Sequence, residues 1–177
     1  SIFETETELL PILIEMRAVG VRVDLQEAEK LKKEFVASEE KVLLKIKKEA
    51  GVDVDIFAAR SIAKAFDKLK IKYPLTEKTK EPSFTANWLL NCEHPIAKFI
   101  REAREIHKFH ATFIDSILKY QHNGRIHAEI HQLRGDGGGT VSGRLSYSNP
   151  NLQQVPARNK ELGTKIRSLF KPESGLQ

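Results

Sequence analysis

The stretch "EHPIAKFIREAREIHKFHATFIDSILKY", residues 93–120, holds the longest regular apolar pattern of this 177-residue chain. Its apolar positions recur alternately three and four residues apart, which is the spacing that lines one face of an α-helix. The pattern predicts a single helix from Pro95 to Tyr120, with proline in the first turn, where a missing N–H leaves no bond unmade. The expected buried seam consists of Ile96, Phe99, Ala103, Ile106, His110, Phe113, Ile117 and Tyr120.

An earlier segment, residues 24–50, predicts a partner for that helix. Asp24 is a suitable N-cap, Glu27 follows three positions later, and Gly51 ends the pattern. Lysines and acids cover the other faces of this helix, which is typical of a solvated surface. We expect the two helices to pack as an antiparallel hairpin roughly 35 to 40 Å long. The apolar stripe of the second helix consists of Ala28, Leu31, Phe35, Ser38, Val42 and Ile46.

Three shorter helices are predicted around this hairpin, at about residues 5–18, 56–69 and 84–91. The first is expected to belong to the core, through a stripe of Leu9, Ile12 or Leu13 and Met16. The stretch "IKYPLTEKTKEPSFT", residues 71–85, is rich in lysine and proline and predicts an exposed loop between the other two helices.

Beyond Gly124 the apolar period changes from that of a helix to that of a strand. The stretch "RIHAEIHQL", residues 125–133, alternates residue by residue, and "GDGGG", residues 135–139, predicts a turn after it. Together these patterns predict an α+β fold that is mainly α, in which a long antiparallel helical hairpin is followed by a short antiparallel β segment.

Composition narrows the class of protein. The chain is 40% hydrophobic and 30% charged, its net charge is +5, and most of the basic excess lies in the last third. A single cysteine, Cys92, cannot form an internal disulfide, which favours a reducing compartment. Because no apolar run approaches the roughly 18 residues of a membrane span, we expect a soluble, cytoplasmic chain without a signal peptide or a membrane partner.

Two polar motifs invite interpretations that the residues support only weakly. "GDGGGT" lacks the lysine and hydroxyl pair of a phosphate-binding loop, so a plain turn is favoured. His127, Glu129 and His131 would share one face of the strand and are a possible metal set. No further ligand is evident nearby, however, so a half-exposed polar face is favoured and no metal site is predicted.

Arg101, Arg104 and Lys108 form a basic row on the longest helix, away from its apolar seam. Solvated charge is the default interpretation of such a row. A track of phosphate contacts becomes credible only if another feature indicates nucleic acid.

The stretch "TVSGRLSYSNPNLQQVPARN", residues 140–159, is that feature. Two prolines and many amide and hydroxyl groups stand between Arg144 and Arg158, which suits neither a helix nor a buried strand. We expect an extended segment that presents its amides outward instead of to a β-ladder.

This stretch closely resembles the T-G-R-L-S-S-x-x-P-N-L-Q-N-I-P-x-R signature of family A DNA polymerases, the bacterial polymerase I and phage type. Upstream segments resemble the family's thumb, so the resemblance covers essentially the whole chain. Ser142, Tyr147 and Gln154 depart from the signature but keep hydrogen-bonding capacity, which suggests a divergent, phage-like member. The resemblance implies a lead-in helix (residues 1–23), a helical thumb (24–122) and the N-terminal part of a palm (123–177).

The resemblance also implies roles for particular residues toward primer-template DNA. Arg144 would donate to the minor-groove edge at the primer end, and the phosphate backbone of the duplex would meet Arg104 and Lys108. Arg158 would lie near the incoming dNTP, where a positive charge helps to hold phosphates. Contacts to template and primer near that end would come from Asn151, Gln153 and Gln154.

The same resemblance implies that catalysis needs more than these residues. In the family, the carboxylates that hold two Mg²⁺ ions lie beyond the position that matches Gln177, so this chain is expected to hold no catalytic residue, to bind no cofactor and to be inactive without the remainder of the polymerase. A stand-alone nucleic-acid-binding helical module and a helical adaptor protein are the alternatives that the sequence leaves open.

Overall fold

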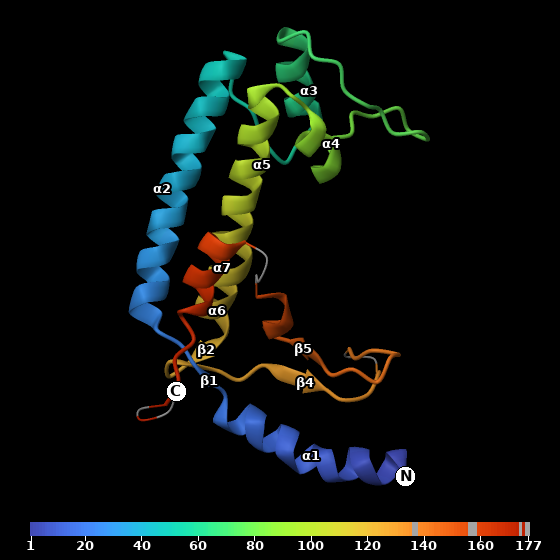
Figure 1. Ribbon diagram of the computed structural model, residues 1–177, viewed down its shortest axis with the longest axis vertical. Helices are drawn as coiled ribbons and strands as arrows, with labels where there is room; N and C mark the ends of the chain where they lie inside the picture. Colours follow the sequence, from blue (N-terminus) through green and yellow to red (C-terminus); the bar gives the residue numbers. More distant parts are fainter. Residues whose placement is uncertain (136–137, 156–158, 174, 176–177) are drawn as a thin grey trace. The chain divides into compact units, whose positions relative to one another are not determined.

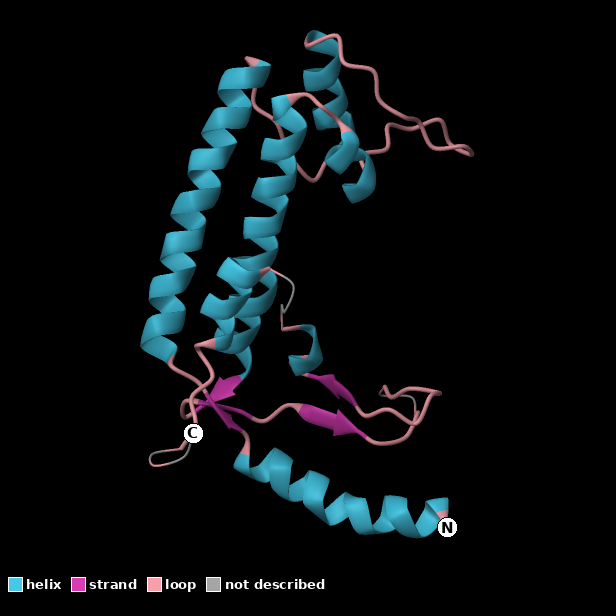
Figure 2. Cartoon of the chain, in the orientation of Figure 1, coloured by secondary structure: helices cyan, strands magenta, loops and turns pink. Residues whose placement is uncertain are grey.

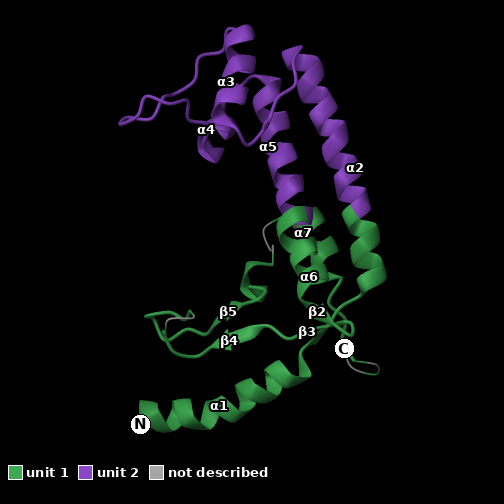
Figure 3. Ribbon diagram, turned by 180° about the vertical axis from the view of Figure 1, so that it is seen from behind, with its two compact units in different colours: residues 1–32, 111–177 green, residues 33–110 purple. Residues whose placement is uncertain are grey.

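The computed structural model describes residues 1–177 except 136–137, 156–158, 174 and 176–177. The chain forms two compact units (Figure 3). Unit 1 contains both ends of the chain, Ser1–Lys32 and Ala111–Gln177, and unit 2 contains the middle, Lys33–His110. The chain passes from one unit to the other between residues 32 and 33 and between residues 110 and 111.

Unit 2 is helical (Figures 1 and 2). It contains the larger part of α2 (Leu25–Ala50), all of α3 (Ala59–Lys68), α4 (Ala86–Asn91) and α5 (Pro95–His107), and the start of a π-helical segment, η1 (Lys108–Ile114). α4 begins at an N-cap formed by Thr85, and α5 begins with a proline, as the sequence predicts.

Within unit 2, α2 and α5 form the expected antiparallel pair. The Phe35 ring meets the Phe109 ring edge-on at 6.0 Å between centroids, whereas Lys45, further along α2, lies 5.7 Å from the Phe99 ring centroid, earlier on α5. As the residue number increases along α2, the number of the contacting residue decreases, which shows that the two helices run antiparallel. The hairpin prediction is confirmed here by contacts between named side chains.

The predicted seam of the long helix needs correction. Ile100 and Ile114 are fully buried, although neither was expected in the seam, whereas Phe99 and Phe113 are only half-buried. The expected single helix also contains the π-helical segment η1 between α5 and α6 (Asp115–Tyr120). A π segment adds a residue to a turn, so it widens the buried face and moves neighbouring side chains around the axis.

The far end of unit 2 has its own aromatic core. The Phe66 ring, fully buried on α3, lies 5.1 Å from Phe84 and 5.8 Å from Trp88 between ring centroids, and Tyr73 lies against both phenylalanines. These contacts tie the segment that follows α3 to α4, so the predicted loop of residues 71–85 is anchored at both ends.

Unit 1 contains short strands beside helices (Figure 2). Strands β1 (Val21–Arg22), β3 (Arg125–Ile126) and β2 (Gln121–His122) lie in that order in an antiparallel sheet, and β4 (Glu129–His131) pairs with β5 (Ser146–Ser148). Helix α1 (Ile2–Val19), the 3₁₀ turn η2 (Leu152–Gln154) and α7 (Lys160–Arg167) complete the unit. The α+β, mainly α class is confirmed.

The β2–β3 turn explains where the helical pattern stops. Asn123 and Gly124 connect the paired residues His122 and Arg125, and both have positive φ, 50° and 77°. A two-residue hairpin turn of this kind requires positive φ at both positions, and Asn-Gly is the pair that adopts it most readily. The predicted single strand of residues 125–133 is in fact two strands, β3 and β4, in different sheets.

The C-terminal helix closes the core of unit 1. Ile166 and Leu169 are fully buried, and the backbone after α7 returns to β1, where Lys171 N donates to Arg22 O at 3.1 Å. The Asp24 N–H donates to Leu169 O at 2.8 Å, and the Asp24 carboxylate accepts from Glu27 N at 3.0 Å. The predicted N-cap of α2 is confirmed, and it lies where the N-terminal and C-terminal segments of unit 1 contact each other.

Helix α1 differs from expectation. Of its residues only Leu13 is buried, whereas Leu10, Ile12, Ile14 and Met16 are about half exposed or more. The reason is that its apolar residues are spread around the helix and do not form one stripe. A polar contact holds it to the segment between β3 and β4, because His127 Nδ1 lies 2.9 Å from Arg17 O. The expectation that an apolar stripe of this helix belongs to the core is therefore wrong, because only Leu13 of α1 is buried in unit 1.

In the part of the chain that the structure describes, no helix combines the length and the apolar character needed to cross a bilayer.

Candidate nucleic-acid interface

The segment of residues 140–155 turns back on β4 before it forms the η2 turn. Residues Ser146–Ser148 pair with Glu129–His131, so Tyr147 lies opposite Ile130. The expectation that this segment avoids a β-ladder is thus wrong for these three residues. Serines and a tyrosine tolerate strand geometry well, and a two-stranded ribbon leaves their polar groups half-exposed.

Arg144 lies just before this strand and is exposed. Its backbone carbonyl accepts a hydrogen bond from Thr140 Oγ1 at 2.7 Å. Among the residues that the structure describes, none forms a hydrogen bond or ion pair with its guanidinium. The backbone of Arg144 is therefore held, while no described residue occupies the five donors of its guanidinium.

Three amide side chains follow on η2, and they behave differently from one another. The Asn151 side chain caps the turn, accepting from Gln153 N at 3.1 Å, and Gln153 Nε2 donates to Leu145 O at 2.9 Å. Gln154 is exposed and lines a hollow beside Phe113. Within this short segment, the side chains of Asn151 and Gln153 therefore hold the backbone that carries Arg144 and Gln154.

Arg158, predicted near an incoming nucleotide, lies outside the described residues, as does the proline at position 156.

The carboxylate of Glu129 fixes the other end of the β4–β5 pair. Its Oε2 accepts from Ser148 Oγ at 3.0 Å and from Asn149 Nδ2 at 3.1 Å. These hydrogen bonds, together with the weaker attraction of Arg17 and His131, hold the pKa of Glu129 below its ordinary value. His131 also lies 2.7 Å from Ser148 Oγ. Glu129 and His131, two members of the possible metal set, therefore both contact the hydroxyl group of Ser148 on β5.

Arg104 departs from the expected solvated basic row. Its Nε donates to Ile56 O at 2.7 Å and its Nη1 donates to Phe84 O at 3.0 Å. Burial lowers the pKa of this guanidinium from its ordinary value, although arginine remains charged at neutral pH. The helical pattern could not reveal this role, because the two carbonyls belong to segments that fold against α5 from elsewhere in the sequence. Lys108, by contrast, is exposed.

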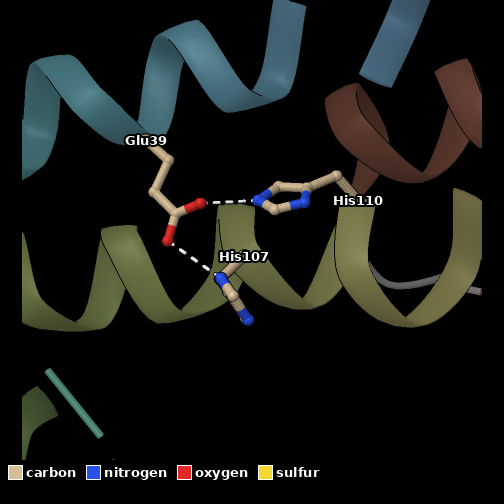
Figure 4. A group of neighbouring side chains, drawn as sticks. All are labelled: Glu39, His107 and His110. Atoms are coloured by element: carbon tan, nitrogen blue, oxygen red, sulfur yellow. Dashed lines mark hydrogen bonds and ion pairs between the residues drawn. The ribbon is translucent and has the colours of Figure 1, made fainter. Parts of the chain in front are cut away.

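A cluster that the sequence analysis missed lies between α2 and the end of α5. Glu39 Oε1 lies 2.9 Å from His107 Nδ1, and Glu39 Oε2 lies 2.5 Å from His110 Nε2 (Figure 4). The ligand atoms of the three residues lie within 4.8 Å of one another. Two histidines three positions apart on the long helix were a usable signal, but their partner Glu39 is 68 and 71 positions away.

Comparison with known proteins gives concordant matches. A family model described as DNA polymerase family A matches residues 25–177. The DNA-directed DNA polymerase of Pseudomonas phage M6 is 33% identical over 184 aligned residues, which cover 98% of this chain and 27% of that protein. DNA polymerase I of Geobacillus stearothermophilus is 33% identical over 175 residues, covering 96% of this chain and 19% of that protein.

A solved structure is similar as well. The POL domain of Pol1 from M. smegmatis, in complex with DNA primer-template and dNTP, matches with a TM-score of 0.75 and 28% sequence identity. The match covers 89% of this chain and 28% of that chain. The chain therefore spans less than a third of the length of these relatives.

Proposed function

Because the chain belongs to DNA polymerase family A, we propose that it contributes primer-template binding to a DNA-directed DNA polymerase. In this proposal residues 24–122 form the thumb, residues 123–177 form the first part of the palm, and residues 1–23 form the helix that leads into them. The compact units divide the chain at other positions because α2 belongs in part to each of them. The proposed boundaries follow whole helices instead.

The observation that supports this proposal best is the state of residues 144–154. A polymerase must hold the primer end without recognising its sequence, which favours donors aimed at minor-groove acceptors that base pairs share. Arg144 and Gln154 are exposed, and the backbone between them is fixed by the β5 ladder and by the Gln153 contact to Leu145. Groups held in this way keep their geometry at low entropic cost when DNA arrives.

The same proposal assigns weaker roles to the remaining candidates. Asn151 and Gln153 would touch the duplex near the primer end with the groups that their turn leaves accessible. Lys108, exposed on η1, would contact phosphate, whereas Arg104 would act mainly by holding the segments around it. Arg158 would help to hold the phosphates of the incoming dNTP.

Family A DNA polymerases are nucleotidyltransferases that use metal ions. We propose that the polymerase containing this chain uses two Mg²⁺ ions, held by carboxylates outside the chain, to activate the primer hydroxyl and stabilise the leaving pyrophosphate. The place of action would be the bacterial cytoplasm or that of a phage-infected host. The work of this chain is then to position the primer end, and no chemical step is assigned to its side chains.

The test is Arg144→Ala in the polymerase that contains this chain. Primer extension should slow by about tenfold or more, whereas duplex affinity should fall by less than about threefold. The reason is that a single bidentate contact sets the position of the primer end, whereas many phosphate contacts together set the affinity. The control is Arg60→Ala, at an exposed arginine of unit 2, which should change neither quantity.

Equal losses of extension and affinity in Arg144→Ala would refute the positioning role. Duplex binding by the full-length protein without any primer extension would support the stand-alone binding module instead.

A further inference from the structure

The Glu39, His107 and His110 cluster joins the two long helices of unit 2. Glu39 projects from α2, and the two histidines come from the last residue of α5 and from η1. Figure 4 shows the carboxylate facing both imidazole rings, with one oxygen toward each, and the ring centroids are 5.0 Å apart. Two neighbouring histidines and a carboxylate about 70 positions earlier in the sequence therefore meet at one point.

The chemistry of these groups is that of a metal site. Imidazole nitrogen and carboxylate oxygen are the usual non-sulfur ligands of Zn²⁺, at about 2.0 to 2.2 Å. Three such ligands around a tetrahedral ion stand about 3.3 Å apart, as that bond length requires. Here the ligand atoms all lie within 4.8 Å of one another, and the two hydrogen-bonded pairs, His107 Nδ1 to Oε1 at 2.9 Å and His110 Nε2 to Oε2 at 2.5 Å, are shorter than 3.3 Å. Small side-chain rotations would open them enough to admit an ion.

The two histidines carry the same number of protons before and after an ion binds. Each imidazole now donates an N–H to the carboxylate, through Nδ1 of His107 and Nε2 of His110. On binding, each ring exchanges its proton through water onto its other nitrogen and offers a lone pair to the metal. The carboxylate exchanges two hydrogen bonds for one metal bond, so no further acid, base or redox partner is needed.

Burial and access both suit a bound ion. Glu39 and His110 are 9% and 7% exposed, so their ligand atoms are shielded from water. The His107 side chain is 39% exposed, which leaves a route of entry. The Phe57 ring lies 4.7 Å from the His107 ring and limits its movement. The site is therefore held from several sides and open at one.

From this geometry we propose that Glu39, His107 and His110 bind one divalent transition-metal ion, of the class of Zn²⁺ or Co²⁺. Two imidazoles and one carboxylate favour these ions over Mg²⁺ and Ca²⁺, which prefer oxygen ligands. The ion clamps α2 to the π-helical segment and stabilises unit 2. This site is separate from the Mg²⁺ chemistry proposed for the whole polymerase, and the inference stands on contacts within unit 2 alone.

The first experiment is titration of the chelator-treated chain with ZnCl₂ and, separately, with MgCl₂. Zn²⁺ should bind with one ion per chain and raise the thermal midpoint of the 177-residue chain by about 5 to 10 °C at a hundredfold excess over Kd. Mg²⁺ should leave the midpoint unchanged. Co²⁺ should give the absorption bands of a four- or five-coordinate ion with nitrogen and oxygen ligands. Failure of the chain to bind Zn²⁺ would overturn the proposal.

Substitutions locate the ion. Glu39→Gln and His107→Gln should each abolish the Zn²⁺-dependent shift, and His107→Gln should still fold because His107 is only partly buried. The matched control is His94→Asn, at the other histidine of unit 2 that lies near a glutamate. The substitution removes the His94 nitrogen that lies 4.0 Å from Glu49 but keeps a side chain able to cap α5. The control should retain the full shift.

A shift that survives Glu39→Gln and His107→Gln, or that disappears in His94→Asn, would place the ion elsewhere and refute the assignment. If Glu39→Gln fails to fold, His107→Gln alone decides between these outcomes.

Discussion

Arg104 in unit 2 and Arg144 in unit 1 are the same residue type in opposite circumstances. Arg104 is partly buried and donates to two backbone carbonyls, whereas Arg144 is exposed and its guanidinium has no partner among the described residues. Both were predicted from sequence as DNA contacts. The comparison teaches that the position of an arginine in a charge pattern does not reveal its role, because that role depends on which segments fold over it.

The two regions also differ in what holds them together. In unit 2 a regular apolar seam between long helices provides the stability, and polar groups such as Arg104 and Glu39 turn inward at its edges. In the segment of residues 144–154, short strands and side-chain hydrogen bonds to the backbone provide the order, and polar groups turn outward. Substitutions in unit 2 should therefore change stability, and substitutions at Arg144 or Gln154 should change DNA binding or extension.

The largest effect is expected in the apolar core of unit 2. Ile100→Ala should lower the free energy of unfolding by about 3 to 4 kcal/mol, because Ile100 is completely buried and its truncation leaves a cavity. The measurement is urea unfolding followed by the fluorescence of Trp88, the single tryptophan of the chain, which lies in unit 2.

The control for this prediction is Phe99→Ala. Phe99 was expected in the seam from sequence but is only half-buried, so its truncation should cost less than that of Ile100 although the side chain is larger. A larger loss of unfolding free energy in Phe99→Ala than in Ile100→Ala would support the seam predicted from the sequence and contradict the observed one.

A smaller effect is expected at Arg104. Arg104→Ala leaves the carbonyls of Ile56 and Phe84, both in buried residues, without this donor, and should cost about 2 kcal/mol in the same unfolding measurement. Arg104→Lys should restore little, because one ammonium cannot reproduce the forked geometry. The matched control is Lys98→Ala, an exposed cation on the same helix.

This substitution also sharpens the comparison with Arg144. Arg144→Ala should leave the unfolding curve of the chain within about 0.5 kcal/mol of the original, as an exposed surface substitution does. A stable chain after Arg104→Ala, or an unstable one after Arg144→Ala, would show that the inward and outward roles are assigned the wrong way round.

How far the sequence could predict this molecule depends on the distance over which each feature is determined. The helical hairpin was predictable because its seam repeats over many turns, and the Asp24 cap because its partner is three residues away. The β2–β3 hairpin was predictable in principle from Asn123 and Gly124, a local signal that the strand pattern obscured. The π-helical segment was not, because the apolar spacing around it is compatible with an ordinary helix.

The candidate site divides in the same way. Arg144 and the amides of residues 151–154 were predicted from a motif contiguous in sequence. Their pairing with β4 was not, because the partner strand lies across the glycine-rich turn and strand register depends on tertiary packing. The cluster at Glu39 was not predicted either, since its members come together only when α2 packs against α5.

The smallest effect concerns Glu129, whose carboxylate joins β4 to the segment before η2. Hydrogen bonds from Ser148 and Asn149 hold its pKa below the ordinary 4.5, so in an NMR titration its carboxyl midpoint should lie under that value. A lowered pKa in the folded chain adds stability that is present above pH 4.5 and is lost as the pH falls through the folded midpoint. Ser148→Ala should move the midpoint upward toward 4.5, whereas Ser146→Ala, on the same strand, should not. If the Glu129 midpoint does not change in Ser148→Ala, then Glu129 does not hold this segment. The fixed backbone inferred for residues 144–154 would then depend on the Gln153 contact alone.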